Sequence, residues 1–324
     1  MAWLGVLWLL AGGLMSVLAL GMGRAAWVLL NPPRRGYAFA LARGMPGAPD
    51  ELGPAQGWTG NAPRWRAWEL RHAGARMPVW EIDGARADGP VVILTHGWGE
   101  SRVHSLPRVA AWNGAASRVI AWDLRGHGEA SGRCALGTTE VEDLLALIDA
   151  VSARPETTTG GPTSGGARGV VLHGFSLGAG VSIAAAGRDG RVSAVIAEAP
   201  YRVPRTPAAA VMARAGIARG VVGRLVLSGA LRAARWMLGS GLDDRAFDRA
   251  RLAHGVRCPL LVLRGSLDDI VPRADAQAIA ESCASGALVE VPGAGHVDLW
   301  TEARHRESAV AAIRALADGA GLGR

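Results

Sequence analysis

The sequence contains no lysine, so all 35 of its basic residues are arginines. These arginines are scattered along the whole chain among abundant alanine and glycine, although the formal net charge is +7. A protein that binds nucleic acid through its charge gathers its basic residues into a patch or a stripe. Because no long basic run occurs, the positive charge reflects a biased composition, and we expect no nucleic-acid partner.

Cysteine is scarce, and the common sequence signatures of a bound metal are missing. The chain has only Cys134, Cys258 and Cys283, with no Cys-x-x-Cys pair, which argues against a disulfide framework and against a zinc site. No His-Glu-x-x-His segment is present that would hold a catalytic metal on a helix. We therefore expect neither a metal nor an organic cofactor.

Charged side chains are also absent from the first part of the chain. Residues 2–23 form an uncharged apolar run that ends at Arg24, and about 20 such residues can cross a bilayer as a helix. We predict that residues 1–30 form a transmembrane helix. A cleaved signal peptide is the alternative, but it would normally carry a positive region before the apolar run and a small-residue cleavage site after it.

The first arginines of the chain indicate how this helix is oriented. Arg24, Arg34, Arg35 and Arg43 all follow the apolar run. Basic residues near the end of a transmembrane helix tend to stay on the cytoplasmic side. We therefore expect a single-pass protein of the cell membrane, with its catalytic domain on the cytoplasmic side.

Beyond the helix, the sequence divides into a linker and one α/β domain. Residues 31–63, rich in proline and glycine, predict a linker of low order. The domain occupies residues 64–320 and begins with two alternating apolar and polar segments, typical of an antiparallel hairpin. Short β-branched runs without alternation follow, separated by helical patterns, which predicts a mostly parallel, doubly wound sheet with helices on both faces. The runs are residues 91–94, 119–122, 170–172, 192–197, 260–263 and 288–291.

Residues 201–256 interrupt this alternation of strands and helices. They contain helical patterns where a single crossover helix would suffice, so we expect an inserted helical cap. Its arginines recur among alanine, valine and leucine. Such a pattern is compatible with a helix face that lies on an anionic membrane surface, and equally with a solvated outer face over an apolar inner one.

The segment Gly-Phe-Ser-Leu-Gly at residues 174–178 has the spacing of a nucleophile elbow. It follows the predicted strand at 170–172 directly and leads into a helical pattern, which is the context that exposes a serine hydroxyl at a sheet edge. The flanking glycines would permit the close backbone approach of such a turn. In a chain with 45 glycines the pattern alone is a weak signal, so the prediction of Ser176 as nucleophile requires partners.

A serine nucleophile needs a base, and the base needs an orienting acid. In sheets of this kind they follow the serine in the order acid, then histidine. The predicted strand at 260–263 leads to Asp268, and the strand at 288–291 leads to His296. We predict that these two residues complete a triad with Ser176. Asp269 and Glu198 are alternative carboxylates at the same edge of the sheet.

Hydrolysis of an acyl group also needs donors for the oxyanion. The backbone N–H of Leu177, directly after the nucleophile, is the first candidate. The second is the N–H of Trp98, in the loop that follows the strand at 91–94. This loop reads His-Gly-Trp-Gly-Glu at residues 96–100.

One further motif completes a resemblance to a known family. Residues 123–132 read Asp-Leu-Arg-Gly-His-Gly-Glu-Ala-Ser-Gly. Together with the motifs above, they make the sequence resemble the α/β-hydrolases over about residues 60–318, in particular the serine-aminopeptidase and monoacylglycerol-lipase-like branch. The resemblance implies an α/β-hydrolase fold and favours Asp268, which alone fits the pattern Gly-x-x-Asp-x-x-Val-Pro. The chain departs from the branch by one extra residue before Ser131 and by Phe175, where many relatives have histidine.

These features predict a membrane-anchored serine hydrolase. We expect it to cleave a small-molecule carboxylic ester, lipid-like or short, through an acyl-enzyme intermediate. A peptide or amide substrate is the alternative within the same chemistry. A non-catalytic binding protein on the same fold is the alternative of another class, although such proteins tend to lose a member of the triad and none is missing here.

Overall fold

One eight-stranded sheet forms the frame of the protein. The computed structural model describes residues 2–153, 169–214, 220–239 and 247–320. Within them the strand order is β1-β2-β4-β3-β5-β6-β7-β8. The hairpin strands β1 and β2 pair antiparallel, β2 also pairs antiparallel with β4, and every other pairing is parallel. The strands are β1 (Trp65–His72), β2 (Ala75–Asp83), β3 (Val91–Thr95), β4 (Arg118–Trp122), β5 (Val170–Phe175), β6 (Val192–Glu198), β7 (Leu260–Gly265) and β8 (Gly286–Val291).

Helices cover both faces of this sheet, which confirms the doubly wound architecture. Successive residues of a strand point to opposite faces, and β3 shows the consequence. Val91 and Ile93 belong to one buried cluster with α4 (Thr139–Ser152), α5 (Leu177–Ala186) and α9 (Arg273–Ser282). Val92 and Leu94 belong to another with α3 (Leu106–Val109) and α10 (Ala303–Gly319). Strands buried on both faces need no polar side, which explains their unalternated sequences.

Residues 31–63 differ from the predicted linker of low order. They form α2 (Tyr37–Leu41) and the 3-10 turns η1 (Pro49–Glu51) and η2 (Pro54–Gln56). Ala40, Leu52 and Trp58 are buried in the cluster that contains α3 and α10. The abundance of proline and glycine concealed these apolar residues, which are spaced too irregularly to show a helix or strand period. The segment is therefore a packed covering of the domain.

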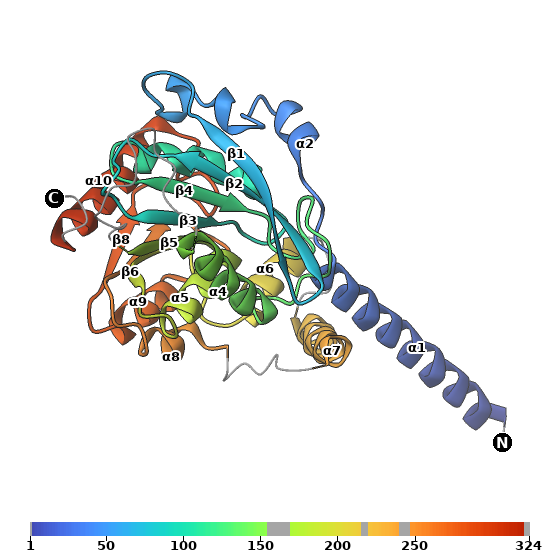
Figure 1. The fold of residues 1–324 in the computed structure, drawn as a ribbon. Coiled ribbons are helices and arrows are strands. Elements are labelled where there is room, and N and C mark those ends of the chain that lie inside the picture. The colour runs from blue at the N-terminus through green and yellow to red at the C-terminus, as the bar shows by residue number, and fades with distance from the viewer. Residues whose placement is uncertain (1, 154–168, 215–219, 240–246, 321–324) are drawn as a thin grey trace.

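The N-terminal helix α1 (Ala2–Leu30) joins the domain at its C-terminal end, and its N-terminal end lies away from the domain. From Trp3 to Leu30 it is long and apolar enough to cross a membrane. Residues 3–17 are exposed, whereas Ala25, Ala26, Leu29 and Leu30 are buried in the core of the domain. Figure 1 shows α1 projecting away from the domain as a single rod.

The described part of the predicted cap consists of two helices between β6 and β7. These are α6 (Arg205–Arg214) and α7 (Gly220–Leu238), which pack against each other. The next helix, α8 (Arg249–Ala253), packs against α5 and α9 and so belongs to the layer that covers the sheet. The insertion therefore ends before α8 and not at residue 256. Residues 215–219 and 240–246 of the predicted cap lie outside the described residues.

Candidate active site

Ser176 lies at a sharp turn between β5 and α5. Its backbone has φ 50° and ψ −105°, a strained conformation for a residue with a side chain. A Cβ added at Gly174 would overlap the backbone of Gly178, and one added at Gly178 would overlap the carbonyl oxygen of Thr95. The Ser176 N–H donates to the Glu198 backbone carbonyl at 2.8 Å. Glycine is thus required on both sides, as the sequence pattern predicts, and the turn has the form of a nucleophile elbow.

His296 and Asp268 form a hydrogen-bonded pair beside this turn. His296 Nδ1 lies 2.8 Å from Asp268 Oδ2. The other oxygen, Asp268 Oδ1, accepts the backbone N–H groups of Ile270 and Val271, each at 2.9 Å. An ionised carboxylate only accepts hydrogen bonds, so the imidazole donates from Nδ1 and its Nε2 is the accepting nitrogen. A base oriented in this way can take a proton at Nε2.

The two alternative carboxylates have different surroundings. Asp269 is exposed. Glu198 is buried, accepts two hydrogen bonds of 2.7 Å from Arg108, and accepts a third of 2.8 Å from Trp300 Nε1. Burial alone would raise the pKa of Glu198, but the nearby Arg108 guanidinium and His173 outweigh it and lower the pKa to about 2. The structure therefore pairs Asp268 with the histidine and Glu198 with Arg108.

One cavity brings the predicted residues together. It has a volume of about 280 Å³, and Ser176, His296, Leu177 and Trp98 all line it. Asp268 lies behind His296, with its side chain fully buried. Leu177 is the first residue of α5, so its N–H has no carbonyl of its own helix to reach. The expected nucleophile, base and oxyanion donors thus share one space.

The loop that carries Trp98 is held by two hydrogen bonds. The Glu100 carboxylate accepts the Gly97 N–H at 3.1 Å, and the Trp98 indole donates to the Leu29 carbonyl of α1 at 2.9 Å. Glu100 also lines the cavity, and burial raises its pKa. The sequence prediction included neither Glu100 nor Arg108 as a site residue. Glu100 could have been found from its place in the His-Gly-x-Gly-Glu motif, whereas no local pattern marks Arg108.

The motif at residues 123–132 supports the site without lining the cavity. The buried Asp123 carboxylate accepts the N–H groups of Arg102 at 2.7 Å and Glu129 at 2.9 Å, and it also pairs with the Arg102 guanidinium. His96, at the end of β3, accepts the Leu124 N–H at 3.0 Å. Burial lowers the pKa of His96 well below its usual value, which keeps it neutral and able to accept. The motif therefore fastens the loop after β4 to the loop of Trp98.

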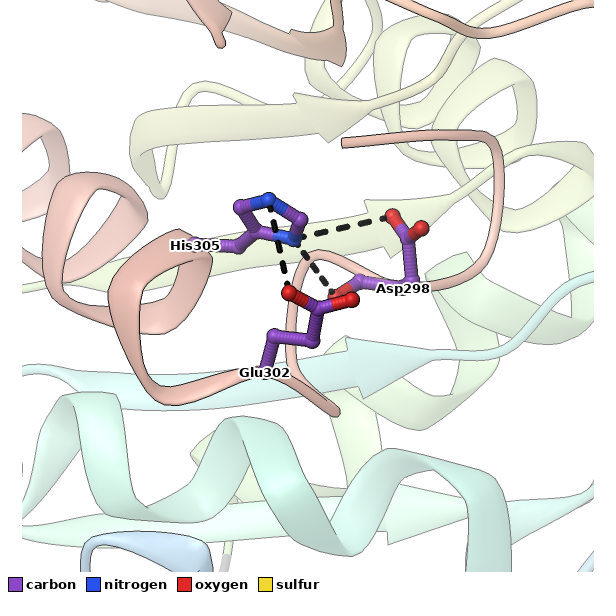
Figure 2. A group of neighbouring side chains, drawn as sticks. All are labelled: Asp298, Glu302 and His305. Carbon is purple, nitrogen blue, oxygen red and sulfur yellow. Dashed lines mark hydrogen bonds and ion pairs between the residues drawn. The ribbon is translucent and has the colours of Figure 1, made fainter. Parts of the chain in front are cut away.

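One group of side chains near the base has the residue types of a metal site. Asp298, Glu302 and His305 offer ligand atoms within 4.8 Å of one another (Figure 2). Both carboxylates already have partners, because Asp298 Oδ1 accepts the Gly295 N–H at 2.6 Å and Glu302 pairs with Arg304 at 3.0 Å. A divalent cation could bind here only in competition with these contacts. In its present form the group braces the loop that carries His296.

Comparisons with known proteins identify the family to which this fold belongs. A model of the alpha/beta hydrolase family matches residues 91–312, more than half of the chain, so the protein belongs to the alpha/beta hydrolase family. Its fold is similar to that of the Pyrococcus furiosus esterase Pf2001, with a TM-score of 0.65 and 19% identity over 90% of this chain and 98% of the esterase. An enol-lactonase from Burkholderia xenovorans has a TM-score of 0.54 and 19% identity over 77% of this chain and 99% of its own.

Two further similarities differ in how much of each protein they cover. A structure described as a membrane phospholipase A and bacterial virulence factor has a TM-score of 0.56 and 15% identity, covering 98% of both chains. A 106-residue stretch is 37% identical to the magnesium-chelatase 30 kDa subunit of Rhodobacter capsulatus. That match covers 30% of this chain and 37% of the subunit, so the chain spans little more than a third of this relative.

The buried ion pair beneath the elbow gives a prediction about stability. Replacing Arg108 by Met leaves the Glu198 carboxylate buried without its ionic partner, and breaking such a pair costs about 3–5 kcal/mol. We expect the free energy of unfolding, measured by denaturant titration in detergent, to fall by this amount. The control is Arg304→Met, which removes an ion pair whose side chains are 73% and 49% exposed and should cost less than about 1 kcal/mol. Equal losses in the two variants would contradict the prediction.

Proposed function

We propose that this protein is a serine hydrolase that cleaves a carboxylic ester through an acyl-enzyme intermediate. The observation that carries the proposal is the hydrogen-bonded His296–Asp268 pair on the same cavity as Ser176, whose strained turn exposes its side chain there. Membership in the alpha/beta hydrolase family supports hydrolysis. The esterase and the enol-lactonase of similar fold support ester chemistry in particular.

In the proposed mechanism, Ser176 Oγ attacks the substrate carbonyl carbon while His296 Nε2 takes the hydroxyl proton. Asp268 holds the imidazole in the required tautomer. The N–H groups of Leu177 and Trp98 stabilise the tetrahedral oxyanion. Its collapse releases the alcohol, which receives the proton from His296. Water then attacks the acyl-enzyme and gives a proton to His296. His296 returns this proton to Ser176 Oγ as the acid is released, which regenerates the free serine.

The cavity favours an apolar acyl group. Its walls include Leu29 of α1, Ala208 of α6 and Leu231 of α7. Transfer of hydrocarbon surface from water into such a pocket contributes about 25 cal/mol of binding free energy per Å². A lipid-like ester is therefore the proposed substrate class, which the similar fold of a membrane phospholipase A supports. An aminoacyl amide is the alternative, and among the described residues Glu100 is the acid that lines the cavity and could accept a hydrogen bond from its amine.

We further propose that α1 is a retained membrane anchor and not a cleaved signal. Leu29 and Leu30 are buried in the domain, and the Leu29 carbonyl accepts the Trp98 indole N–H. Removal of α1 would take a wall from the cavity and the partner from Trp98. The arginines after the apolar run place the domain on the cytoplasmic side of the cell membrane in this proposal.

The role of Ser176 is tested by its replacement with Ala. We expect labelling by a fluorophosphonate probe to disappear and ester hydrolysis to fall on the order of 10⁶-fold, because the nucleophile is lost. Ser182→Ala, at a buried serine of the same helix, is the matched control and should keep both activities. Undiminished labelling of the Ser176→Ala variant would reject the assignment.

The identity of the triad acid is tested with two neighbouring aspartates. Asp268→Asn should lower kcat by about 10⁴-fold, because the amide favours the wrong histidine tautomer. Asp269→Asn changes an exposed residue next to it and should alter kcat by less than about threefold. Circular dichroism of both variants checks that they fold. If the Asp269 variant were the inactive one, the mechanism would have to be redrawn.

The orientation is tested by protease protection. In right-side-out vesicles, added proteinase K should leave the domain intact, and it should cut the domain after the membrane is opened with detergent. Inverted vesicles are the control and should lose the domain without detergent. Digestion in sealed right-side-out vesicles would place the domain on the outer side.

A further inference from the structure

Helix α7 of the cap has two apolar faces. The inner face, Val226, Leu227, Ala230 and Ala234, is buried, and α7 packs against α1 and α6. The outer face carries Val222, Leu225, Gly229 and Trp236, separated by three, four and seven residues, which places them on one side of a helix. Leu225 is 56% exposed and Trp236 is 84% exposed. A water-soluble cap helix would present polar residues there, so this face requires an apolar neighbour.

The N-terminal helix crosses α7 on this outer face. A Cβ added at Gly229 would overlap the sulfur of Met22, so the two helices are in direct contact at this point. Figure 1 shows α7 at the base of α1, where α1 joins the domain. If α1 spans the bilayer, α7 therefore lies at the end of the span.

The position of the crossing sets the depth of α7. Met22 is almost the last residue of the uncharged run, and Arg24 follows it as the first charged residue. The Arg24 guanidinium lies 5.0 Å from the centre of the Trp27 ring, and both residues are exposed. Tryptophan and arginine at the end of an apolar span are typical of the interface between hydrocarbon and water. The crossing therefore coincides with the membrane boundary of α1.

The charges of α7 fit the same boundary. The helix carries Arg224, Arg232 and Arg235, all exposed, and no acidic residue. A helix with an apolar face, a tryptophan and several arginines binds in the headgroup region of membranes that contain anionic lipids. The long arginine side chains can reach the phosphates while the apolar face contacts hydrocarbon.

These observations connect the membrane to the cavity of Ser176. Leu231 of α7 and Leu29 of α1 both line that cavity, so its wall on this side is built from the two helices at the membrane boundary. We propose that the outer face of α7 docks on the anionic bilayer next to α1 and delivers a membrane-dissolved ester to Ser176 without passage through water. This inference rests on the proposed ester hydrolysis and adds where the substrate comes from.

The test uses full-length protein in nanodiscs of phosphatidylcholine and phosphatidylglycerol. The triple variant Val222→Ser, Leu225→Ser, Trp236→Ser should hydrolyse a long-chain ester dissolved in the nanodisc about tenfold more slowly. The reason is that these three apolar side chains no longer enter the lipid. Its rate on water-soluble p-nitrophenyl acetate should change less than about twofold. Leu41→Ser, which alters an exposed leucine of α2, is the matched control and should affect neither rate.

A second readout measures the depth of α7 directly. A nitroxide attached to the Leu225→Cys variant, in a background without the native cysteines, should be more accessible to oxygen dissolved in lipid than to a water-soluble nickel reagent. Nitroxide exposed to water in nanodiscs, or an unchanged rate on the lipid ester, would overturn the docking. A dimer by light scattering, with the label equally protected in detergent, would show instead that a second copy covers this face and would also overturn it. Failure of the wild type on p-nitrophenyl acetate would reject the proposed function itself.

Discussion

The close approach of three backbone segments at the turn after β5 is the constraint on which the site depends. Gly174 and Gly178 leave no room for a Cβ against each other and against Thr95, and Ser176 is held between them at a positive φ. Such strain persists only where the surrounding structure holds the residue in its strained conformation. Here the central strands of a parallel sheet supply that rigidity, because β5 is hydrogen-bonded to β3 on one side and β6 on the other.

A buried charge pair supports the same turn from below. Glu198 accepts the Ser176 N–H through its backbone and holds Arg108 through its side chain. The Arg108 guanidinium lies 4.8 Å from the centre of the Phe175 ring, whose own centre is 5.2 Å from that of His296. The ion pair thus contacts the segment of the serine directly and His296 through the Phe175 ring. Burial of charge is costly, so its value here lies in fixing the relative position of these segments.

The last turns of α1 form part of the candidate active site. Leu29 lines the cavity with its side chain and accepts the Trp98 indole with its carbonyl, in the loop of the expected oxyanion donor. The end of this apolar helix is therefore also a wall of the cavity. This arrangement makes the end of α1 part of the folded domain, because the buried residues Ala25, Ala26, Leu29 and Leu30 belong to its core.

Elements whose signals are local could be predicted from the sequence. Apolar runs without alternation marked the inner strands, because these are buried on both faces, and the glycine spacing marked the turn at Ser176, because steric exclusion acts between near neighbours in the chain. The order of the motifs along the chain then led to the alpha/beta hydrolase fold, which the comparisons confirm.

Pairings and packing between segments far apart in the chain became visible only in the tertiary structure. It paired Asp268 with His296, and it directed Glu198 to Arg108, a residue 90 positions away. Residues 31–63 pack onto the domain, the cap ends before α8, and α7 packs against α1. These outcomes have one physical reason: each depends on which surfaces meet in space, and no period or spacing within a single segment encodes its partner.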